Sequence, residues 1–339
     1  MRVLYPLRYY PTLTETFVYR EIDGLIDRGH EVVIASMGER QDGALQDEPP
    51  RSPVLRVPRH PLRGRLRAHG PGLRWLAGVR GAEEAARLAW LLETVGSVDR
   101  VHAHFAGAAA EWGRAIQLEL GLPFSVMVHA VDLFRPRETM EEVLGAASVV
   151  LTVAEHHRAL LRQRGVESRL LRCGPDLRAW RMEPPPAGPL VALAVARNVP
   201  KKGLDLLLQA WEQLDRPQAR LHLVSDLADP GLPGVQVHGL LPPAGVRALL
   251  AGCNLGVLPC RRAPDGDMDG VPVSLMEALA AGRPVIGTEV SGLPELLDEA
   301  CGWLLPPERV DRLVQALREA HDRPEERFRR GAAGPGRLR

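Results

Sequence analysis

Aromatic residues are scarce in this sequence: phenylalanine, tryptophan and tyrosine make up only 4% of its 339 residues. Such a chain lacks the stacking platforms on which many proteins bind single-stranded nucleic acids. Net charge is also nearly absent, since 43 lysines and arginines face 42 aspartates and glutamates, which leaves +1 at pH 7. No overall electrostatic field draws the chain to polyanions, and we predict no nucleic-acid partner.

Cysteines and long apolar segments are few as well. The four cysteines form no C-x-x-C pair and are Cys173, Cys253, Cys260 and Cys301. This spacing argues against a disulfide framework and a zinc knuckle, and we assign no metal ligand. No uncharged apolar segment reaches the 18 residues of a membrane span, and the start, MRVLYPLRYYP, lacks the apolar stretch of a signal peptide. We expect a cytoplasmic protein with reduced cysteines.

Lysine is the rarest basic residue. Among the 43 basic residues only two are lysines, and they are adjacent, Lys201 and Lys202. In a chain biased towards arginine, lysine remains where a compact and flexible point charge is needed. The pair is therefore a candidate site for an anionic group, although chance explains the adjacency equally well.

Short apolar strands alternate with amphipathic helices along the whole chain, which is typical of parallel α/β domains. The segment RMEPPPAGP at 181–189 interrupts this alternation, because three consecutive prolines continue neither a helix nor a central strand. We predict two Rossmann-like doubly wound domains that face each other across a cleft. They comprise residues 1–180 and 190–321, joined by the linker at 181–189 and followed by a C-terminal tail at 322–339 whose end we expect to be frayed.

The expected elements follow from this pattern. Strands are predicted at 2–5, 30–36, 100–104, 124–129, 149–153, 190–196, 221–225, 254–259 and 284–287, and helices at 15–28, 82–93, 203–214, 243–251, 273–281 and 310–321.

Ligands of open α/β sheets bind beyond the carboxyl ends of the strands. The segment R-N-V-P-K-K-G follows the strand predicted at 190–196 and leads into a helix. Its cations, Arg197 and Lys202, together with the free N–H groups at a helix N-terminus, suit a diphosphate. A basic surface turn is the alternative. No G-x-G-x-x-G or P-loop pattern follows a predicted strand, which disfavours a nicotinamide site.

Three aspartates, Asp265, Asp267 and Asp269, follow the strand predicted at 254–259. The spacing invites a calcium loop, but such a loop needs a bidentate glutamate where this sequence has Met276. A diphosphate bridged by a metal ion is a second interpretation of these acids.

A third interpretation pairs Asp269 with Glu277 as carboxylates that bind a donor. Gly270, Val271 and Pro272 connect Asp269 to the helix that carries Glu277. One acid then precedes the helix and the other lies in its second turn, where the two could clamp vicinal hydroxyls. An exposed helical acid is the alternative for Glu277, but its neighbours look buried, and an acid among apolar residues needs a partner.

Three histidines of the first half lie on predicted strands. His102 and His104 alternate and therefore share a face, while His129 ends an apolar strand and is followed by Asp132. A histidine at a strand end is often only a satisfied polar group, so we expect two of the three to be structural. His129 has the position that suits a binding cleft.

Residues 51–80 hold eight arginines and no aspartate or glutamate. The segment could contact anionic lipid at the inner membrane face, or a lipid-linked acceptor. Its prolines interrupt any long amphipathic helix, which favours the alternative of a solvated basic helix and loop.

Several segments together resemble glycosyltransferase family 4, the retaining sugar transferases of GT-B fold. The similar segments are PTLTETFVYREIDGLIDRGHEV, VHAHFA, FSVMVHAVDLF, LRCGPDL, ARNVPKKG and DGDMDGVPVSLMEALAAGRPVIGTEVSGLPEL. They span nearly the whole chain, and the last, which resembles the E-x7-E segment of the family, is the most specific.

The resemblance implies a role for individual residues. Arg197 and Lys202 would hold the donor diphosphate. Glu277 would bind the ribose hydroxyls and Asp269 the donor sugar, in a site that includes the stretch from Gly270 to Pro272. His129 would face the sugar and the reacting centre. The sequence departs from the family at Asp269, which is one methylene shorter than the usual glutamate.

We therefore predict a retaining, metal-independent hexosyltransferase. It would move a sugar from a nucleotide-diphosphate sugar, its co-substrate, to a saccharide, lipid-linked or small-molecule acceptor during polysaccharide or glycoconjugate biosynthesis, and it would use no further cofactor. A non-catalytic nucleotide-sugar binding protein and a GT-B nucleotide-sugar epimerase are the alternatives.

Overall fold

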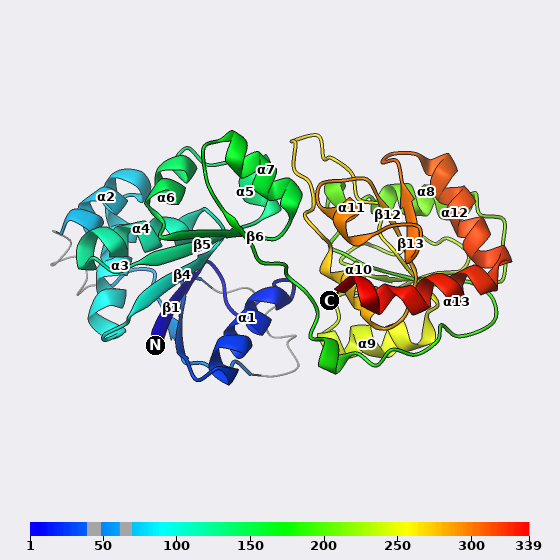
Figure 1. Cartoon of the computed structure of the whole chain (residues 1–339), viewed down its shortest axis with the longest axis horizontal. Coiled ribbons are helices and arrows are strands. Elements are labelled where there is room, and N and C mark those ends of the chain that lie inside the picture. Colours follow the sequence, from blue (N-terminus) through cyan, green and yellow to red (C-terminus); the bar gives the residue numbers. More distant parts are fainter. Residues whose placement is uncertain (39–48, 62–69, 339) are drawn as a thin grey trace. The chain divides into compact units, whose positions relative to one another are not determined.

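The computed structural model describes residues 1–38, 49–61 and 70–338 (Figure 1). The chain divides into two compact units, Met1–Arg172 and Cys173–Arg339, here called unit 1 and unit 2. The proline-rich segment at 181–189 packs with unit 2. Carbonyl oxygens of Glu183 and Gly188 accept hydrogen bonds from the guanidinium groups of Arg283 and Arg327, at 2.7 and 2.6 Å.

In unit 1 the described residues form a sheet of seven parallel strands in the order β3-β2-β1-β4-β5-β6-β7. The chain starts in the middle of the sheet, winds to one edge, and returns beside β1 to wind to the other. Leu4 on β1 lies next to Val33 on β2 and Val101 on β4, and all three side chains are buried. The elements are β1 (Arg2–Leu7), α1 (Thr16–Asp27), β2 (Glu31–Ser36), β3 (Val54–Arg56), α2 (Pro71–Arg80), α3 (Ala82–Thr94), β4 (Arg100–His104), α4 (Ala108–Leu120), β5 (Phe124–Val128), α5 (Ala130–Phe134), α6 (Met140–Ala146), β6 (Val149–Thr152), α7 (Glu155–Gln163) and β7 (Arg169–Leu170).

In unit 2 the described residues form a sheet of six parallel strands in the order β10-β9-β8-β11-β12-β13. The elements are η3 (Leu177–Ala179), β8 (Val191–Val195), η4 (Pro200–Lys202), α8 (Leu204–Glu212), β9 (Arg220–Val224), β10 (Val235–Val237), α9 (Pro243–Gly252), β11 (Leu255–Val257), α10 (Val273–Ala280), β12 (Val285–Thr288), α11 (Leu293–Leu296), β13 (Gly302–Leu305), α12 (Val310–Asp322), α13 (Pro324–Ala333) and η5 (Gly334–Leu338). Both doubly wound sheets agree with the predicted fold class.

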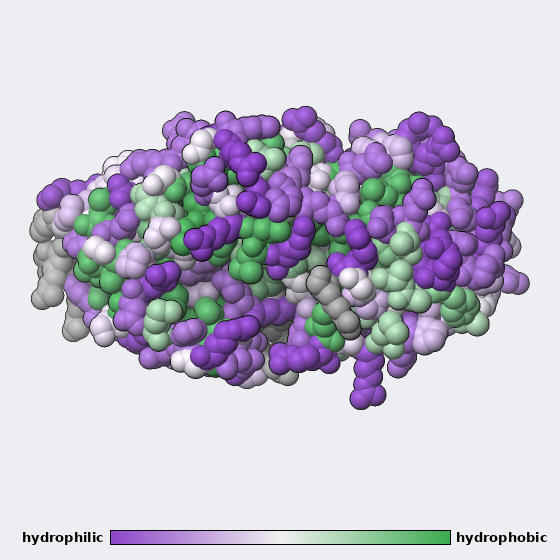
Figure 2. All heavy atoms as spheres, viewed as in Figure 1, coloured by the Kyte–Doolittle hydropathy of each residue, from purple (hydrophilic) through white to green (hydrophobic). Residues whose placement is uncertain are grey.

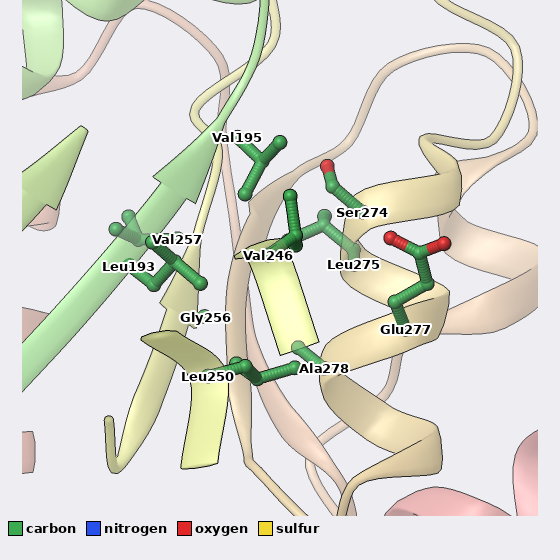
Figure 3. A pocket seen from close by; sticks show the side chains of 10 residues that line it. All are labelled: Leu193, Val195, Val246, Leu250, Gly256, Val257, Ser274, Leu275, Glu277 and Ala278. Atoms are coloured by element: carbon green, nitrogen blue, oxygen red, sulfur yellow. The ribbon is translucent and has the colours of Figure 1, made fainter. Parts of the chain in front are cut away.

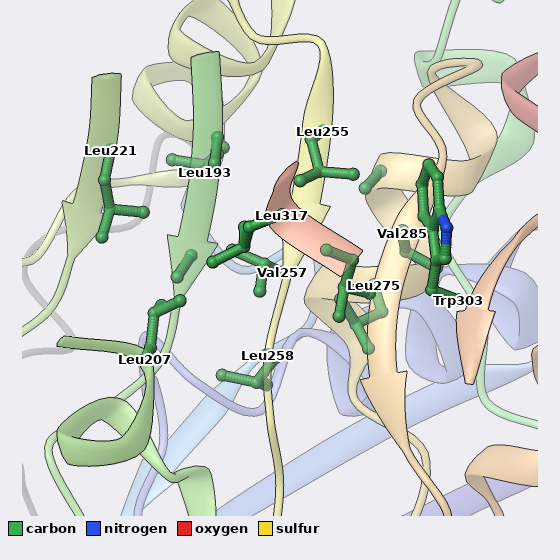
Figure 4. Close-up of a cluster of buried hydrophobic side chains, with 14 of the residues drawn as sticks. Leu193, Leu207, Leu221, Leu255, Val257, Leu258, Leu275, Val285, Trp303 and Leu317 are labelled. Carbon is green, nitrogen blue, oxygen red and sulfur yellow. The ribbon is translucent and has the colours of Figure 1, made fainter. Parts of the chain in front are cut away.

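The core of unit 2 shows why its elements form where they do. Leu193 on β8 and Leu255 on β11 meet Leu207 of α8, Leu275 of α10 and Leu317 of α12 in one buried cluster (Figure 4). Strands covered on both faces need nearly continuous apolar runs, and the short apolar strands of this half satisfy that need. The exposed residues of α12 are hydrophilic, among them Asp311, Arg312 and Arg318, and this end of unit 2 is largely hydrophilic at its surface (Figure 2).

The expectation of a frayed C-terminus is wrong for the described residues. The last helix, α13, and the 3-10 turn η5 pack on unit 2. Arg327 is completely buried, and its guanidinium donates to the carbonyls of Gly188 and Ala320. Gly331 lies so close to Gly282 that a Cβ atom at 331 would stand 2.3 Å from the Gly282 carbonyl oxygen. Glycine at position 331 therefore allows close packing of the C-terminal helix.

In the part of the chain that the structure describes, no helix is long and apolar enough to cross a membrane.

Candidate functional site

Both lysines of the chain lie in the turn that follows β8. Lys202 Nζ forms an ion pair and hydrogen bond with the carboxylate of Asp269. Lys201 Nζ lies 3.0 Å from Asp267 Oδ2 and 3.9 Å from Asp269 Oδ1. The four side chains are mostly buried, with exposed fractions of 12–16%. The structure thus joins two predicted segments, the basic turn and the acidic loop, at the carboxyl ends of the strands.

The burial of the pair makes each charge depend on the other. Burial alone would raise the pKa of Asp269, but Lys202 and Lys201 outweigh burial and lower it. Burial likewise favours the neutral amine of Lys202, and Asp269 outweighs burial so that the pKa is raised. Arg197 is near enough for its charge to act on Lys202, and it forms no ion pair with the described residues. Arg197 is therefore a cation without a carboxylate partner beside a balanced pair.

Gly203 sets the position of Lys202. It has a φ of +65° and caps α8. A Cβ atom at this position would stand 2.0 Å from the carbonyl oxygen of Pro259, just after β11. Only glycine combines this backbone conformation with so close an approach, so the sequence K-K-G fits the turn for a steric reason.

Glu277 lies in the second turn of α10 and lines a recess in unit 2 (Figure 3). Ser274 stands beside it on the same helix, and apolar side chains of β8 and β11 form the opposite wall, among them Val195 and Val257. Val195 ends β8, two residues before Arg197. The recess therefore combines an apolar wall with two polar groups, and β8, which forms part of this wall, leads into the cationic turn.

The connecting residues between the two acids lie where the sequence predicted. Gly270 and Pro272 are buried, and Val271 packs against the core of unit 2. Pro272 is the N-cap residue of α10. The stretch from Gly270 to Pro272 thus holds Asp269 in place ahead of the helix that carries Glu277.

The three aspartates do not gather into a metal-binding group. Among the described residues, the one set of His, Cys, Asp or Glu ligand atoms that meets this description comes from Glu21, His102 and His104 in unit 1. Asp267 and Asp269 instead face the two lysines. The side chains therefore give the calcium-loop interpretation no support.

His129 lies in unit 1, at the N-cap of α5. Its side chain is 8% exposed and packs against the rings of Phe17 and Phe105, whose centroids are 4.8 and 4.5 Å away. Its backbone N–H donates to the Asp132 carboxylate at 2.9 Å. Its Nε2 lies 3.1 Å from Nδ1 of His104. Burial, and then the neighbouring His104, lowers the pKa of His129 well below its usual range, which favours the neutral ring.

Glu21 is a partly buried charge that the sequence analysis missed. Its carboxylate lies near His102 and His104 and accepts a hydrogen bond from Tyr5 Oη at 2.8 Å. Burial would raise the pKa of Glu21, but the two histidines lower it far below its usual range. His102 and His104 share a face as predicted. The only signal for Glu21 was its place in the family-like segment, because its partners are distant in sequence.

The basic segment at 51–80 is partly neutralised by acids from elsewhere in unit 1. Arg51 lies 2.9 Å from Asp27, and Arg80 lies 3.4 Å from Glu111. Part of this segment, residues 62–69, lies outside the described residues.

Comparisons with known proteins agree with this architecture. The family model for Glycosyltransferase Family 4 matches residues 14–178, and the model for Glycosyl transferases group 1 matches residues 189–323. The chain is 28% identical over 375 residues to WcaL of Escherichia coli, a glycosyltransferase assigned to colanic acid biosynthesis, and this match covers 94% of the chain and 90% of WcaL. A GDP-mannose-dependent phosphatidylinositol monomannoside mannosyltransferase of Corynebacterium glutamicum is 33% identical over 41% of the chain and 40% of the relative.

Among solved structures, HepE of Anabaena, determined in complex with UDP and glucose, superposes with a TM-score of 0.78 at 18% identity. The superposition covers 99% of the chain and 94% of HepE. The fold is thus that of the GT-B glycosyltransferases. With the two family models covering both units, the chain belongs to the group 1 glycosyltransferases, which include family 4.

Proposed function

We propose that this glycosyltransferase moves a hexose from a nucleoside diphosphate to a saccharide or lipid-linked acceptor, with retention of the anomeric configuration. The observation that carries the proposal is the cationic turn of Arg197 and Lys202 beside the recess lined by Glu277. A diphosphate fits the cations, and a ribose diol fits the carboxylate.

The chemistry of the transfer explains the need for these cations. The bond between the sugar and the phosphate breaks through an oxocarbenium-like state, and negative charge grows on the departing diphosphate. Cations fixed at that point stabilise the growing charge, and removing one such group typically lowers the rate about 100–1000-fold. Arg197 and Lys202 supply this charge without a metal ion on the donor.

Lys202 approaches the diphosphate while it is paired with Asp269. We therefore assign Asp269 two tasks: it holds the ammonium group of Lys202 in place, and it contacts the transferred sugar. His129 would act on the sugar from unit 1. Retention would follow from attack on the same face, with the departing phosphate taking the proton of the acceptor hydroxyl.

The acceptor is a saccharide or a lipid-linked saccharide in the building of an extracellular polysaccharide. The likeness to WcaL over most of both chains supports this part of the proposal. An epimerase or a non-catalytic binding protein is not favoured by the relatives. Contact of residues 51–80 with anionic lipid stays a hypothesis, which co-sedimentation with anionic and neutral vesicles tests.

A thermal-shift panel of nucleoside diphosphates identifies the donor base, with GDP and UDP tested first because relatives and structural neighbours carry these names. NMR of the reaction with the matching nucleotide sugar then reports the anomeric configuration of the product. Retention supports the proposal. Inversion would refute the mechanism, and turnover of the donor into an isomer with no acceptor present would indicate an epimerase.

A further inference from the structure

Three side chains of unit 1 converge from two elements: Glu21 from α1, and His102 and His104 from alternate positions of β4. His102 Nε2 lies 3.0 Å from Glu21 Oε1, and His104 Nε2 lies 3.3 Å from Glu21 Oε2. The candidate ligand atoms of all three lie within 4.8 Å of one another. Both histidine side chains are more than nine-tenths buried, with exposed fractions of 7% and 0%.

The two Nε2 atoms lie close to the Glu21 carboxylate but are poorly aligned with it. Neither atom makes a hydrogen bond of acceptable geometry within the described residues, although the carboxylate is close. Buried polar atoms without a well-aligned partner are uncommon and call for an explanation. A metal ion between the three side chains would provide one.

The distances fit a specific kind of ion. A tetrahedral zinc ion bonds to histidine nitrogen and carboxylate oxygen at about 2.0–2.2 Å, which places its ligand atoms roughly 3.3–3.5 Å apart. The two contacts of 3.0 and 3.3 Å are close to this spacing. Two imidazoles and one carboxylate are also the ligand types that suit zinc, whereas magnesium and calcium prefer oxygen alone.

Each of the two histidines has a partner on its other ring nitrogen, and the Glu21 carboxylate is held by Tyr5 through Oε1. His102 Nδ1 lies 2.7 Å from Ser125 Oγ, and His104 Nδ1 lies 3.1 Å from His129 Nε2. Tyr5 Oη donates to the Glu21 carboxylate at 2.8 Å. Metal-binding histidines are oriented in this way, with one nitrogen on the ion and the other hydrogen-bonded to a neighbour.

We infer that Glu21, His102 and His104 bind a divalent cation of the zinc class, with the fourth coordination position left open. The site belongs to unit 1 and is separate from the diphosphate site proposed in unit 2. It requires nothing of the donor, so the inference stands or falls independently of the proposed function.

The test uses the untagged full chain, freed of metal by dialysis against a chelator and titrated calorimetrically with zinc chloride. Bound zinc is counted by elemental analysis after removal of free metal. Glu21→Gln keeps the shape of the side chain but removes its charge. Ser125→Ala leaves the three proposed metal ligands intact and removes the hydroxyl that contacts Nδ1 of His102. His222→Gln is the matched control, because it alters a histidine pair in unit 2 whose ring nitrogens lie 2.9 Å apart.

We expect one zinc ion per chain for the unaltered protein and for His222→Gln, and no binding of magnesium. Ser125→Ala should bind zinc about 10–100-fold more weakly, the usual effect of losing such a partner, and Glu21→Gln should lose at least as much. Circular dichroism without metal shows whether each variant is folded. If Glu21→Gln is unfolded, the zinc affinity of Ser125→Ala provides the test. Absence of zinc binding in the unaltered chain would overturn the inference and leave a network held by hydrogen bonds alone. Equal zinc affinity in the unaltered chain and in the folded Glu21→Gln and Ser125→Ala variants would overturn it as well.

Discussion

At the scale of single residues, the ion pair of Lys202 with Asp269 dominates the proposed donor site. The two side chains are mostly buried, and removing one partner of such a pair typically costs about 3–5 kcal/mol because the other charge stays buried. A single substitution therefore mixes lost stability with lost binding. A double variant that removes both the Lys202 and the Asp269 charge is needed to separate the loss of stability from the loss of binding.

The first prediction uses Lys202→Met, Asp269→Asn and the double variant, with Lys201→Met as a control that removes the same charge one position away. Lys202→Met should weaken binding of the nucleoside diphosphate by about 1.5–3 kcal/mol, the range of a hydrogen bond to a charged group. The double variant should bind the nucleoside diphosphate as weakly as Lys202→Met does, but it should be more stable than either single variant. Asp269→Asn should retain most of the diphosphate affinity, because the amide oxygen still accepts a hydrogen bond from Lys202, and it should lower turnover of the nucleotide sugar.

Calorimetry on the diphosphate and steady-state rates on the donor measure the two effects, and denaturant unfolding measures stability. Lys201→Met should lose less affinity than Lys202→Met. If Asp269→Asn lost diphosphate affinity as severely as Lys202→Met, Asp269 would not be a contact to the sugar.

The second prediction concerns Glu277, which we assign to the ribose. Glu277→Gln should weaken the binding of the nucleoside diphosphate and of its sugar conjugate equally, by about 1.5–3 kcal/mol. The ribose does not change charge during transfer, so the contact contributes uniformly to ground state and transition state. Calorimetry on both ligands provides the comparison. A loss confined to the sugar conjugate would place Glu277 at the sugar instead.

At the scale of elements, local patterns predicted much of the fold. Local sequence patterns marked β4, α10 and just over half of the described strands and α-helices within a few residues, because each pattern reports the burial of its own segment. Contacts between distant segments were beyond this kind of inference. Lys202 and Asp269 are 67 residues apart, and nothing in either segment indicates the pairing. The docking of α13 depends on Arg327 reaching distant carbonyls, which composition cannot reveal.

The third prediction tests the turn between β8 and α8. Gly203→Ala should destabilise the chain by about 2–4 kcal/mol, because alanine is strained at positive φ and its Cβ would strike the Pro259 carbonyl. It should also weaken diphosphate binding by displacing Lys202. Gly252→Ala is the control, since a Cβ there meets nothing within 4 Å, and it should change stability by less than about 0.5 kcal/mol. Urea unfolding of both variants gives the comparison, and equal stability would refute the steric account.

The fourth prediction concerns the start of α5, where the Asp132 carboxylate accepts a hydrogen bond from the backbone N–H of His129. Burial raises the pKa of Asp132 to about 7, against opposing hydrogen bonds from His129 and Ala106 and the charge of Arg137. The folded chain thus binds this proton more tightly than the unfolded chain. The contribution of Asp132 to stability is therefore fully present below pH 4 and is lost as the pH rises to 7.

Asp132→Asn cannot ionise and should remove this dependence. The stability of the variant relative to the unaltered chain should rise by about 2–4 kcal/mol between pH 4 and pH 8, given about 1.4 kcal/mol for each pKa unit. Urea unfolding at several pH values measures it. A difference that stays constant with pH would mean that Asp132 titrates normally.

At the scale of the whole molecule, the two units divide the proposed work. Under the proposed function, Arg197, Lys202 and Glu277 of unit 2 would bind the donor, and His129 of unit 1 would act on the sugar. Positions after predicted strands singled out these residues one segment at a time, and the family resemblance joined them into one site, because their segments lie far apart in sequence. The central claim is that the cations of unit 2 alone neutralise the donor diphosphate.

The most direct test of that claim is calorimetric titration of the full chain with the preferred nucleoside diphosphate, in EDTA and in excess magnesium. We predict the same affinity in both buffers, because Arg197 and Lys202 replace the metal ion that other enzymes place on the diphosphate. Loss of binding in EDTA that magnesium restores, and zinc does not, would contradict the account and return the aspartates at 265, 267 and 269 to the role of metal ligands.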